Sequence, residues 1–232
     1  MKRFAFTLTA VLAATAAFAQ TDSLNTPRPQ NDWMRMHKSD FEVSIGLNTF
    51  ADRNTSGITG YELRPIGSRF ISLGSTHRFK LVSGRNAALA LKTGVEVSWN
   101  NFMLEGNRQI TADGPTVLFP ETATPLSKSK LTAAYLNIPV MPTVVFRKGA
   151  FTHISLGGYA GMRLDSYTKV KEEDGTKDRT HGRYYLSNFR YGIGLDLGIR
   201  GVATLFAQYD LNTVFDRSRG PQLNTINFGI RL

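Results

Sequence analysis

Hydrophobic and polar residues alternate with a period of two along most of the chain beyond residue 38. The clearest segment spans residues 188–200, in which Ile193 and Leu195 alternate with Gly194 and Asp196. This period indicates β-strands, because successive side chains of a strand point to opposite faces. Eight such segments, most of them roughly ten residues or longer, lie at about residues 41–48, 71–79, 89–99, 135–146, 153–165, 188–200, 204–211 and 225–232.

The connections between these segments alternate in length. Short turns are expected at residues 82–86, 147–150 and 200–201, and longer polar stretches lie at 51–68, 100–130, 169–182 and 212–223. Three short turns and four long loops suit eight antiparallel strands with both chain ends on the short-turn side. Short periplasmic turns, long external loops and an even strand number are typical of barrels in a bacterial outer membrane.

The composition of the two strand faces predicts which face meets lipid. One face carries bulky Leu, Ile, Val and Phe, and the other carries Gly, Ser, Asn and single charges. The interior of an eight-stranded barrel is only just wide enough for small side chains. We therefore predict an all-β fold, an eight-stranded antiparallel up-and-down transmembrane β-barrel. Aromatic residues expected at the two membrane interfaces are Phe79, Trp99, Phe146, Tyr184, Tyr185 and Phe215.

The first residues read as a secretory signal peptide. Lys2 and Arg3 precede an apolar run, and Ala17-Phe18-Ala19 forms a small-residue cleavage pattern. We therefore divide the chain into a signal peptide at 1–19, a polar periplasmic tail at 20–38 that contains two prolines, and a barrel at 39–232. This division places the mature protein in the outer membrane of a Gram-negative bacterium after signal-peptide cleavage.

Composition narrows the protein classes further. Hydrophobic residues make up 41% of the chain, which argues against disorder. The absence of cysteine excludes disulfide scaffolds, thiolate zinc sites and thiol catalysis. Beyond the first twenty residues there is no run of 18 apolar residues, so a protein with several transmembrane helices is excluded.

Charged residues on the small, polar face are the main candidates for function. Charges enclosed in a barrel need partners. We expect Arg190 to lie opposite Asp210 and Glu42 to lie near Arg231. A static network of ion pairs that fills the lumen is the favoured interpretation, and a narrow ion or proton path is the alternative. The proposed lumen residues are Glu42, Arg78, Lys92, Glu96, Arg163, Asp165, Arg190, Asp196, Asp210 and Arg231.

Catalytic and cofactor chemistry find little support in the sequence. The four histidines have no ligand spacing for a metal. Near the expected loops, His181 lies close to Asp178 and Ser56 close to Asp52, but no nucleophile motif is present. We expect no enzyme activity, no catalytic residue, no metal and no cofactor.

An excess of basic residues points to anionic partners at the membrane surface. Lys plus Arg number 28 against 18 Asp plus Glu. The expected partners are outer-membrane lipid, including lipopolysaccharide phosphates, the barrel-assembly machinery during insertion, and an unidentified external or periplasmic protein. Nucleic acid is not expected for a secreted chain. Candidate anionic-lipid contacts are Arg53, Arg69, Lys128, Lys130, Arg217 and Arg219.

The motifs also resemble a known family. The run Ala134-Tyr135-Leu136-Asn137-Ile138-Pro139 resembles the Y-L-x-I-P strand of PorT-like outer-membrane β-barrel proteins, often called the porin family. The Gly-rich strands around Gly157 and Gly192 and the closing run 227–232 are similar as well. This resemblance implies an outer-membrane barrel over residues 39–232 and is almost silent about activity, although some members resemble components of a protein-secretion system.

The sequence therefore favours a non-enzymatic outer-membrane barrel with a filled polar lumen and external loops for structural or binding roles. The alternatives are a passive narrow channel or porin for small solutes or ions, a barrel component associated with a secretion system, an enzyme active at the external rim, and a soluble periplasmic carrier.

Overall fold

The computed structural model describes residues 39–52 and 57–232, and this part of the chain is built from β-strands and loops. The proposed signal peptide, the tail at 20–38 and Arg53 lie outside the described residues. Within the described ranges no helix is long and apolar enough to cross a membrane. The strands are β1 (Ser39–Asp52), β2 (Arg69–Ser83), β3 (Ala87–Met103), β4 (Leu126–Phe146), β5 (Phe151–Glu172), β6 (Lys177–His181), β7 (Phe189–Ile199), β8 (Thr204–Asp210) and β9 (Leu223–Arg231).

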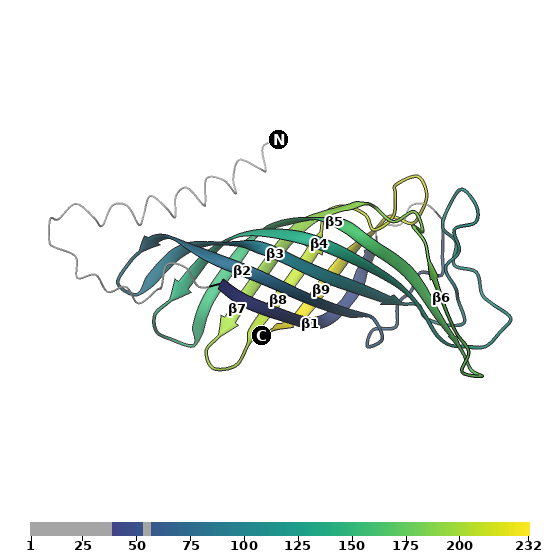
Figure 1. The fold of residues 1–232 in the computed structure, drawn as a ribbon, viewed down its shortest axis with the longest axis horizontal. Coiled ribbons are helices and arrows are strands. Elements are labelled where there is room, and N and C mark those ends of the chain that lie inside the picture. Colours follow the sequence, from purple (N-terminus) through teal and green to yellow (C-terminus); the bar gives the residue numbers. More distant parts are fainter. Residues whose placement is uncertain (1–38, 53–56) are drawn as a thin grey trace.

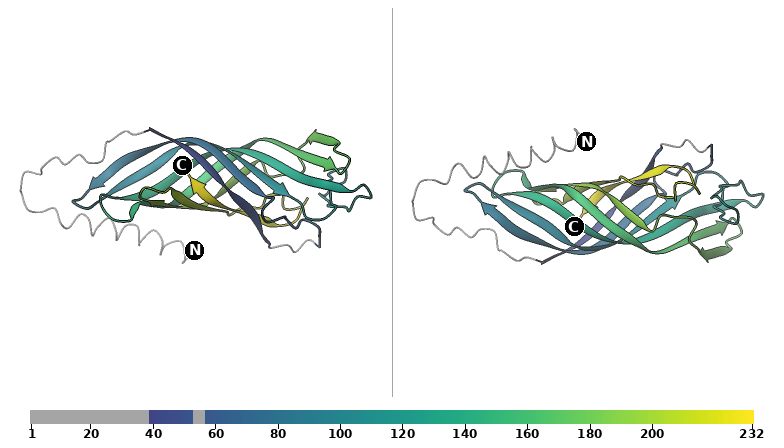
Figure 2. Two further views of the ribbon diagram at one scale, coloured as in Figure 1. Left: turned by 90° about the horizontal axis from the view of Figure 1, so that it is seen from below. Right: turned by 90° about the horizontal axis from the view of Figure 1, so that it is seen from above.

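Eight of these strands close into an antiparallel barrel. Their order is β4-β3-β2-β1-β9-β8-β7-β5, and the additional pairing of β4 with β5 closes the circle. The short turns lie at one end of the tilted strands and the long loops lie at the other (Figures 1 and 2). The predicted eight-stranded up-and-down barrel is confirmed.

Strand β6 is the main departure from the predicted elements. It pairs only with β5, in a hairpin that extends beyond the barrel at the long-loop end (Figure 1). The stretch 169–182, predicted as a loop, is therefore mostly strand. Its turn lies at residues 173–176, with Gly175 in a left-handed conformation at φ +94°.

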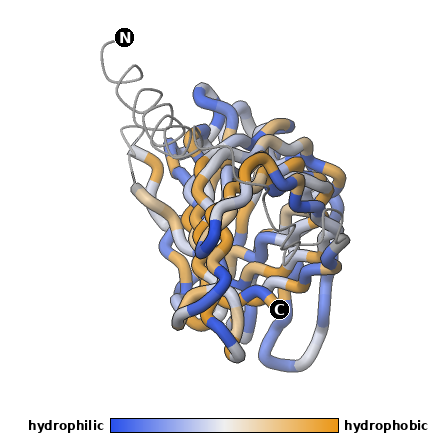
Figure 3. Tube along the Cα trace, turned by 90° about the vertical axis from the view of Figure 1, so that its left-hand side faces the viewer, coloured by the Kyte–Doolittle hydropathy of each residue, from blue (hydrophilic) through white to orange (hydrophobic). Residues whose placement is uncertain are grey.

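The two faces of the strands are occupied as the alternation predicts. Along β7, Ile193 and Leu195 point outward and are 49% and 45% exposed, whereas Arg190 and Asp196 are 3% and 2% exposed. Apolar and polar positions alternate along the strands in the view down the barrel (Figure 3). An exposed belt of Leu, Ile, Val and Phe around a polar interior is the arrangement that a bilayer stabilises.

Glycine permits the close approach of the first and last strands. Gly46 of β1 pairs with Gly229 of β9. A Cβ atom on Gly46 would lie 2.2 Å from the carbonyl oxygen of Phe228, and a Cβ on Gly229 would lie 2.3 Å from that of Ile45. Real Cβ atoms do not approach backbone this closely, so the pairing of β1 with β9 depends on these two glycines.

Candidate functional site: a filled lumen beneath an ordered cap

Six charged side chains meet inside the barrel. Lys92 Nζ lies 2.8 Å from Glu42 Oε1 and 3.0 Å from Asp196 Oδ2. Arg231 Nη1 lies 2.8 Å from the same Asp196 oxygen, and its Nη2 lies 3.3 Å from Glu96 Oε2. Arg78 is the sixth member, and its Nη2 lies 3.9 Å from Glu42 Oε1. We call these residues, namely Glu42, Arg78, Lys92, Glu96, Asp196 and Arg231, the central charge cluster.

The central charge cluster contains three carboxylates and three cations, and five of its members are less than 10% exposed. A fourth carboxylate, that of Asp40, lies 2.9 Å from Arg78 Nη1 at the edge of the cluster. Neutral inward groups also contribute, because Ser72 and Asn137 donate hydrogen bonds to Glu96, and Arg231 Nε donates to the Ser44 hydroxyl at 2.9 Å. Pairing with opposite charges and additional hydrogen bonds are what make buried ions tolerable in a low-dielectric interior.

A second ionic group lies nearer the long-loop end of the lumen. Arg190 donates to one oxygen of Asp210 through Nε at 3.2 Å and Nη2 at 2.8 Å. Tyr159 donates its hydroxyl hydrogen bond to the same oxygen. The Arg190 guanidinium lies 5.0 and 5.1 Å from the ring centroids of Tyr159 and Tyr135. The expected proximity of Arg190 and Asp210 is thus present in the structure.

Sequence reasoning did not identify Tyr135 and Tyr159 as members of this group. Both occupy inward positions of their strands and are buried. The sequence did place both tyrosines on the face that otherwise carries small residues. A large aromatic side chain on that face fills much of a narrow lumen, and this was the available signal.

Two of the ten proposed lumen residues lie elsewhere. Arg163 is at the rim, where it donates to Ser166 and Asn188. Asp165 is exposed and contacts His181 at 3.2 Å, so its predicted inward orientation was wrong. The cause is a register shift in the β4–β5 pairing, in which Ala134 pairs with Asp165 but Tyr135 pairs with Arg163. Such a bulge adds one residue and reverses the faces beyond it.

The interior holds almost no free space at the level of the central charge cluster. The hollow there has a volume of about 10 Å³ and is lined by members of the cluster together with residues such as Met141 and Tyr159. A single water molecule requires about this much space.

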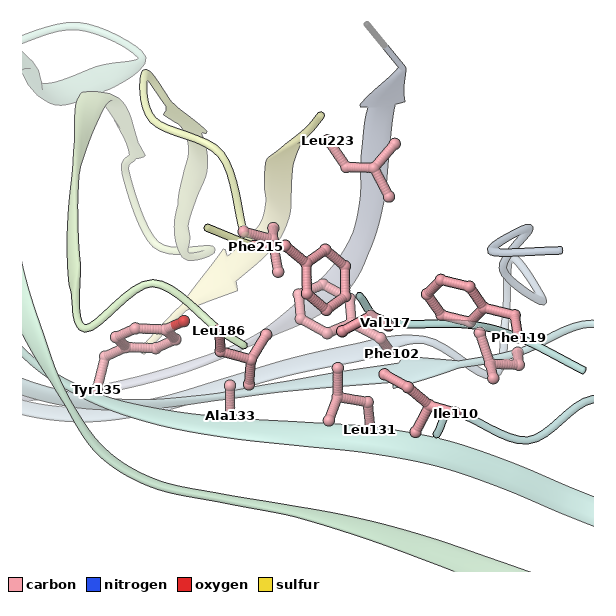
Figure 4. Packing of buried hydrophobic residues seen from close by; sticks show 12 residues of the cluster. Phe102, Ile110, Val117, Phe119, Leu131, Ala133, Tyr135, Leu186, Phe215 and Leu223 are labelled. Atoms are coloured by element: carbon pink, nitrogen blue, oxygen red, sulfur yellow. The ribbon is translucent and has the colours of Figure 1, made fainter. Parts of the chain in front are cut away.

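A second closure lies at the long-loop end, where the loops pack into a hydrophobic cap over the lumen. Phe215 and Val117 come from different loops and are 1% and 0% exposed, and Phe215 meets Phe119 edge to face at 6.1 Å (Figure 4). The loop between β3 and β4 carries the bridges Arg108↔Glu121 and Thr111↔Leu118. The cap residues are Phe102, Leu104, Ile110, Val117, Phe119, Leu131, Ala133, Tyr135, Leu186, Val214, Phe215 and Leu223.

The surface of the cap carries an open cleft of about 520 Å³ lined by charged and aromatic residues. Tyr184 and Tyr185 on its wall both have left-handed backbones, at φ +46° and +49°. Tyr185 is held by a hydrogen bond from its hydroxyl to the Gly114 carbonyl at 2.9 Å and by the Arg219 guanidinium 4.8 Å from its ring. The prediction that Tyr184, Tyr185 and Phe215 form an interfacial girdle was therefore wrong, because Phe215 belongs to the cap and the two tyrosines pack against it.

The candidate anionic-lipid residues do not form one site. Arg219 belongs to the cleft, and Arg217 lies in the same exposed loop. Arg69 is on the outer surface of β2, within electrostatic reach of Lys130. Lys128 and Lys130 line a separate hollow of about 310 Å³ together with three lysines that sequence reasoning did not propose, namely Lys169, Lys171 and Lys177.

His181 pairs with Asp165 rather than with its sequence neighbour Asp178. Asp178 points to the opposite face of β6 and accepts a hydrogen bond from the Thr180 hydroxyl at 3.1 Å. No hydroxyl nucleophile makes a hydrogen bond to His181 among the described residues.

A family model and a solved structure are similar to this chain. The crystal structure of Ail, the attachment invasion locus protein of Yersinia pestis, is similar over 86% of this chain and 100% of that chain, with 14% sequence identity and a TM-score of 0.32. No curated protein matches the sequence. A family model described as outer membrane protein beta-barrel domain matches residues 18–217. A barrel with an exposed apolar belt, a polar lumen and this family match place the chain in the outer membrane, and the chain belongs to the outer membrane protein beta-barrel domain family.

Proposed function

We propose that this protein is a non-enzymatic and non-conducting outer-membrane barrel whose ordered external cap serves a structural or binding role. The observation that carries the proposal is the closure of the lumen at two levels. The central charge cluster leaves a hollow of about 10 Å³, and the hydrophobic cap lies above it.

The two closures oppose different kinds of solute. The side chains of the central charge cluster hold one another at 2.8–3.9 Å, so an entering ion would have to displace a paired charge. The cap is apolar, so a hydrated ion would have to lose its water to cross it. A passive channel or porin for small solutes, the first alternative, would require both closures to open.

The external cap provides what a binding surface requires. Its cleft is concave, has a volume of about 520 Å³, and combines Tyr184 and Tyr185 with charged groups such as Asp216 and Arg219. Aromatic and arginine side chains are the residues most often found at the energetic centres of protein interfaces. This composition supports a protein or glycan partner in preference to a small apolar ligand.

An enzyme active at the rim has weaker support. The pair His181–Asp165 is more than half exposed at His181 and has no hydroxyl nucleophile bonded to it among the described residues. The resemblance to PorT-like barrels, and with it a role beside a secretion system, stays a prediction from the motifs.

Planar-bilayer recording tests the closed lumen. The purified protein is reconstituted beside a sixteen-stranded porin as a positive control, and we expect no stable single-channel steps from the wild-type chain. A second sample carries Lys92→Ser and Asp196→Ser, which removes one cation and one carboxylate and leaves the net charge of the lumen unchanged. The surface pair Glu62→Ser and Arg108→Ser is its matched control, because these residues form an exposed salt bridge at 3.0 Å. Stable currents from the wild-type protein would refute the proposal.

A further inference from the structure

Six cations form a grid on three neighbouring strands at the external end of the barrel. Lys171 of β5 pairs with Lys128 of β4 on one side and with Lys177 of β6 on the other. One step nearer the membrane, Lys169 pairs with Lys130 and with Arg179 in the same way. We call Lys128, Lys130, Lys169, Lys171, Lys177 and Arg179 the cationic grid.

All members of the cationic grid share the outward face of the sheet. The intervening residues Ser129 and Val170 are buried on the inward side, and Asp178 of β6 belongs to the opposite face as well. The five lysines surround the hollow of about 310 Å³, and the Arg179 guanidinium lies 3.7 Å from the ring centroid of Tyr167. The grid is therefore a concave, purely cationic surface.

This arrangement is unfavourable without an anion. Like charges directly opposite each other across a sheet destabilise the strand pairing, and the grid contains four such pairs. No carboxylate of the described residues makes a salt bridge to any of the five lysines. Burial lowers the pKa of Lys130, and the charges of Lys169 and Lys128 lower that pKa further. A surface that served only solubility would intersperse both signs of charge.

The height of the cationic grid above the membrane identifies the class of anion. The outward apolar side chains that are not buried end at Leu136 on β4 and at Leu164 on β5, six and five residues from Lys130 and Lys169. At about 3.3 Å per residue and a strand tilt of about 40°, the two lysines lie roughly 13–15 Å beyond the hydrocarbon edge. Tyr167 stands between the apolar belt and the grid, where aromatic side chains meet the headgroups.

We propose that the cationic grid binds the phosphate groups of a phosphorylated glycolipid in the outer leaflet of the membrane. Phosphates of such a lipid lie at the height of the long lysine side chains, which can reach toward the headgroups. Two phosphates on one sugar backbone would bridge the two rows of the grid and remove the repulsion between strands β4, β5 and β6. This inference goes beyond the proposed closed lumen and does not depend on it.

Binding of defined lipids tests the proposal. The full-length protein is held in a neutral detergent, and its affinity for lipid A that carries two phosphates is compared with that for the same lipid after enzymatic dephosphorylation. The test variant is Lys130→Gln/Lys169→Gln/Lys171→Gln. The matched control is Arg85→Gln/Arg147→Gln/Lys148→Gln, which removes three exposed cations at the short-turn end. We expect at least a tenfold loss of affinity for the test variant, none for the control, and a similar loss when the phosphates are removed.

A stability measurement separates a binding role from simple misfolding. Because the like-charge contacts are relieved, the test variant should unfold at a higher temperature than the wild-type protein in neutral detergent, and lipid A should no longer stabilise it. Equal affinity of the test variant and the wild-type protein would overturn the proposal, as would equal binding of the dephosphorylated lipid. Inorganic pyrophosphate that binds as tightly as lipid A would show that a free anion, and not the glycolipid, is the occupant.

Discussion

Removing the charge of Asp196 is the most direct test of the central charge cluster. Asp196 is 2% exposed and accepts from Lys92 at 3.0 Å and from Arg231 at 2.8 Å. At an effective dielectric constant of about 20, each contact contributes about 5–6 kcal/mol of gross attraction. Desolvation of the carboxylate offsets much of this, and the loss of one partner from a buried ionic group costs about 3–5 kcal/mol in net terms. We expect Asp196→Asn to lower the free energy of unfolding by that amount.

The assay is urea unfolding in neutral-lipid vesicles, with the folded fraction read from migration on unheated gels. The second change Lys92→Met should restore at least half of the loss, because two carboxylates then face two cations. Asp178→Asn, on an exposed face of β6, is the control and should change stability by less than about 0.5 kcal/mol. If Asp196→Asn cost less than about 1 kcal/mol, or if Lys92→Met deepened the loss, charge balance would not be what stabilises the lumen.

Two further outcomes follow from the packing of the barrel and its cap. Gly229→Val should reduce the yield of folded barrel severalfold in refolding assays, because its Cβ would meet the Ile45 carbonyl, whereas Gly158→Ala should fold normally, since the nearest atom to its Cβ lies 3.5 Å away. Phe215→Ala should lower the free energy of unfolding of the cap by about 3–5 kcal/mol. The loop at residues 104–125 should then be cut by protease while the strands stay protected, and mass spectrometry of the fragments would report both. Resistance of that loop to protease in the variant would contradict the role given to Phe215.

The barrel itself could be predicted from the sequence because its pattern is repeated in every strand. Each outward position must be apolar and each inward position small or polar, so the eight segments supply eight consistent observations of one rule. Arg190 and Asp210 could be placed near each other because the connection between their strands is short. In the structure it spans residues 200–203, and Asp210 pairs with Gly192, two positions from Arg190.

The parts that could not be predicted depend on local departures from that rule. A one-residue bulge near Asp165 leaves the composition of β5 unchanged but turns that side chain outward. The cap arises from contacts between loops that are far apart in sequence, such as that between Phe119 and Phe215, and no periodic pattern marks such contacts. The cationic grid depends on the pairing of β5 with both β4 and β6, which places Lys169 and Lys171 between the cations of β6 and the lysines of β4, some tens of residues away.

The central charge cluster also helps to explain why this barrel adopts one register. A slip of one residue in β7 would exchange its two faces, so that Leu195 would enter the lumen and Asp196 would face hydrocarbon. A charged side chain in the middle of the bilayer costs about 2–4 kcal/mol, and the partners left in the lumen would lose their balance as well. An apolar lumen would impose no comparable cost, because either face could then meet lipid. The buried ions therefore contribute less to the stability of the barrel than to its register, because they make every wrong strand alignment costly. The alternation of apolar residues along a barrel strand is too weak to exclude those alignments alone.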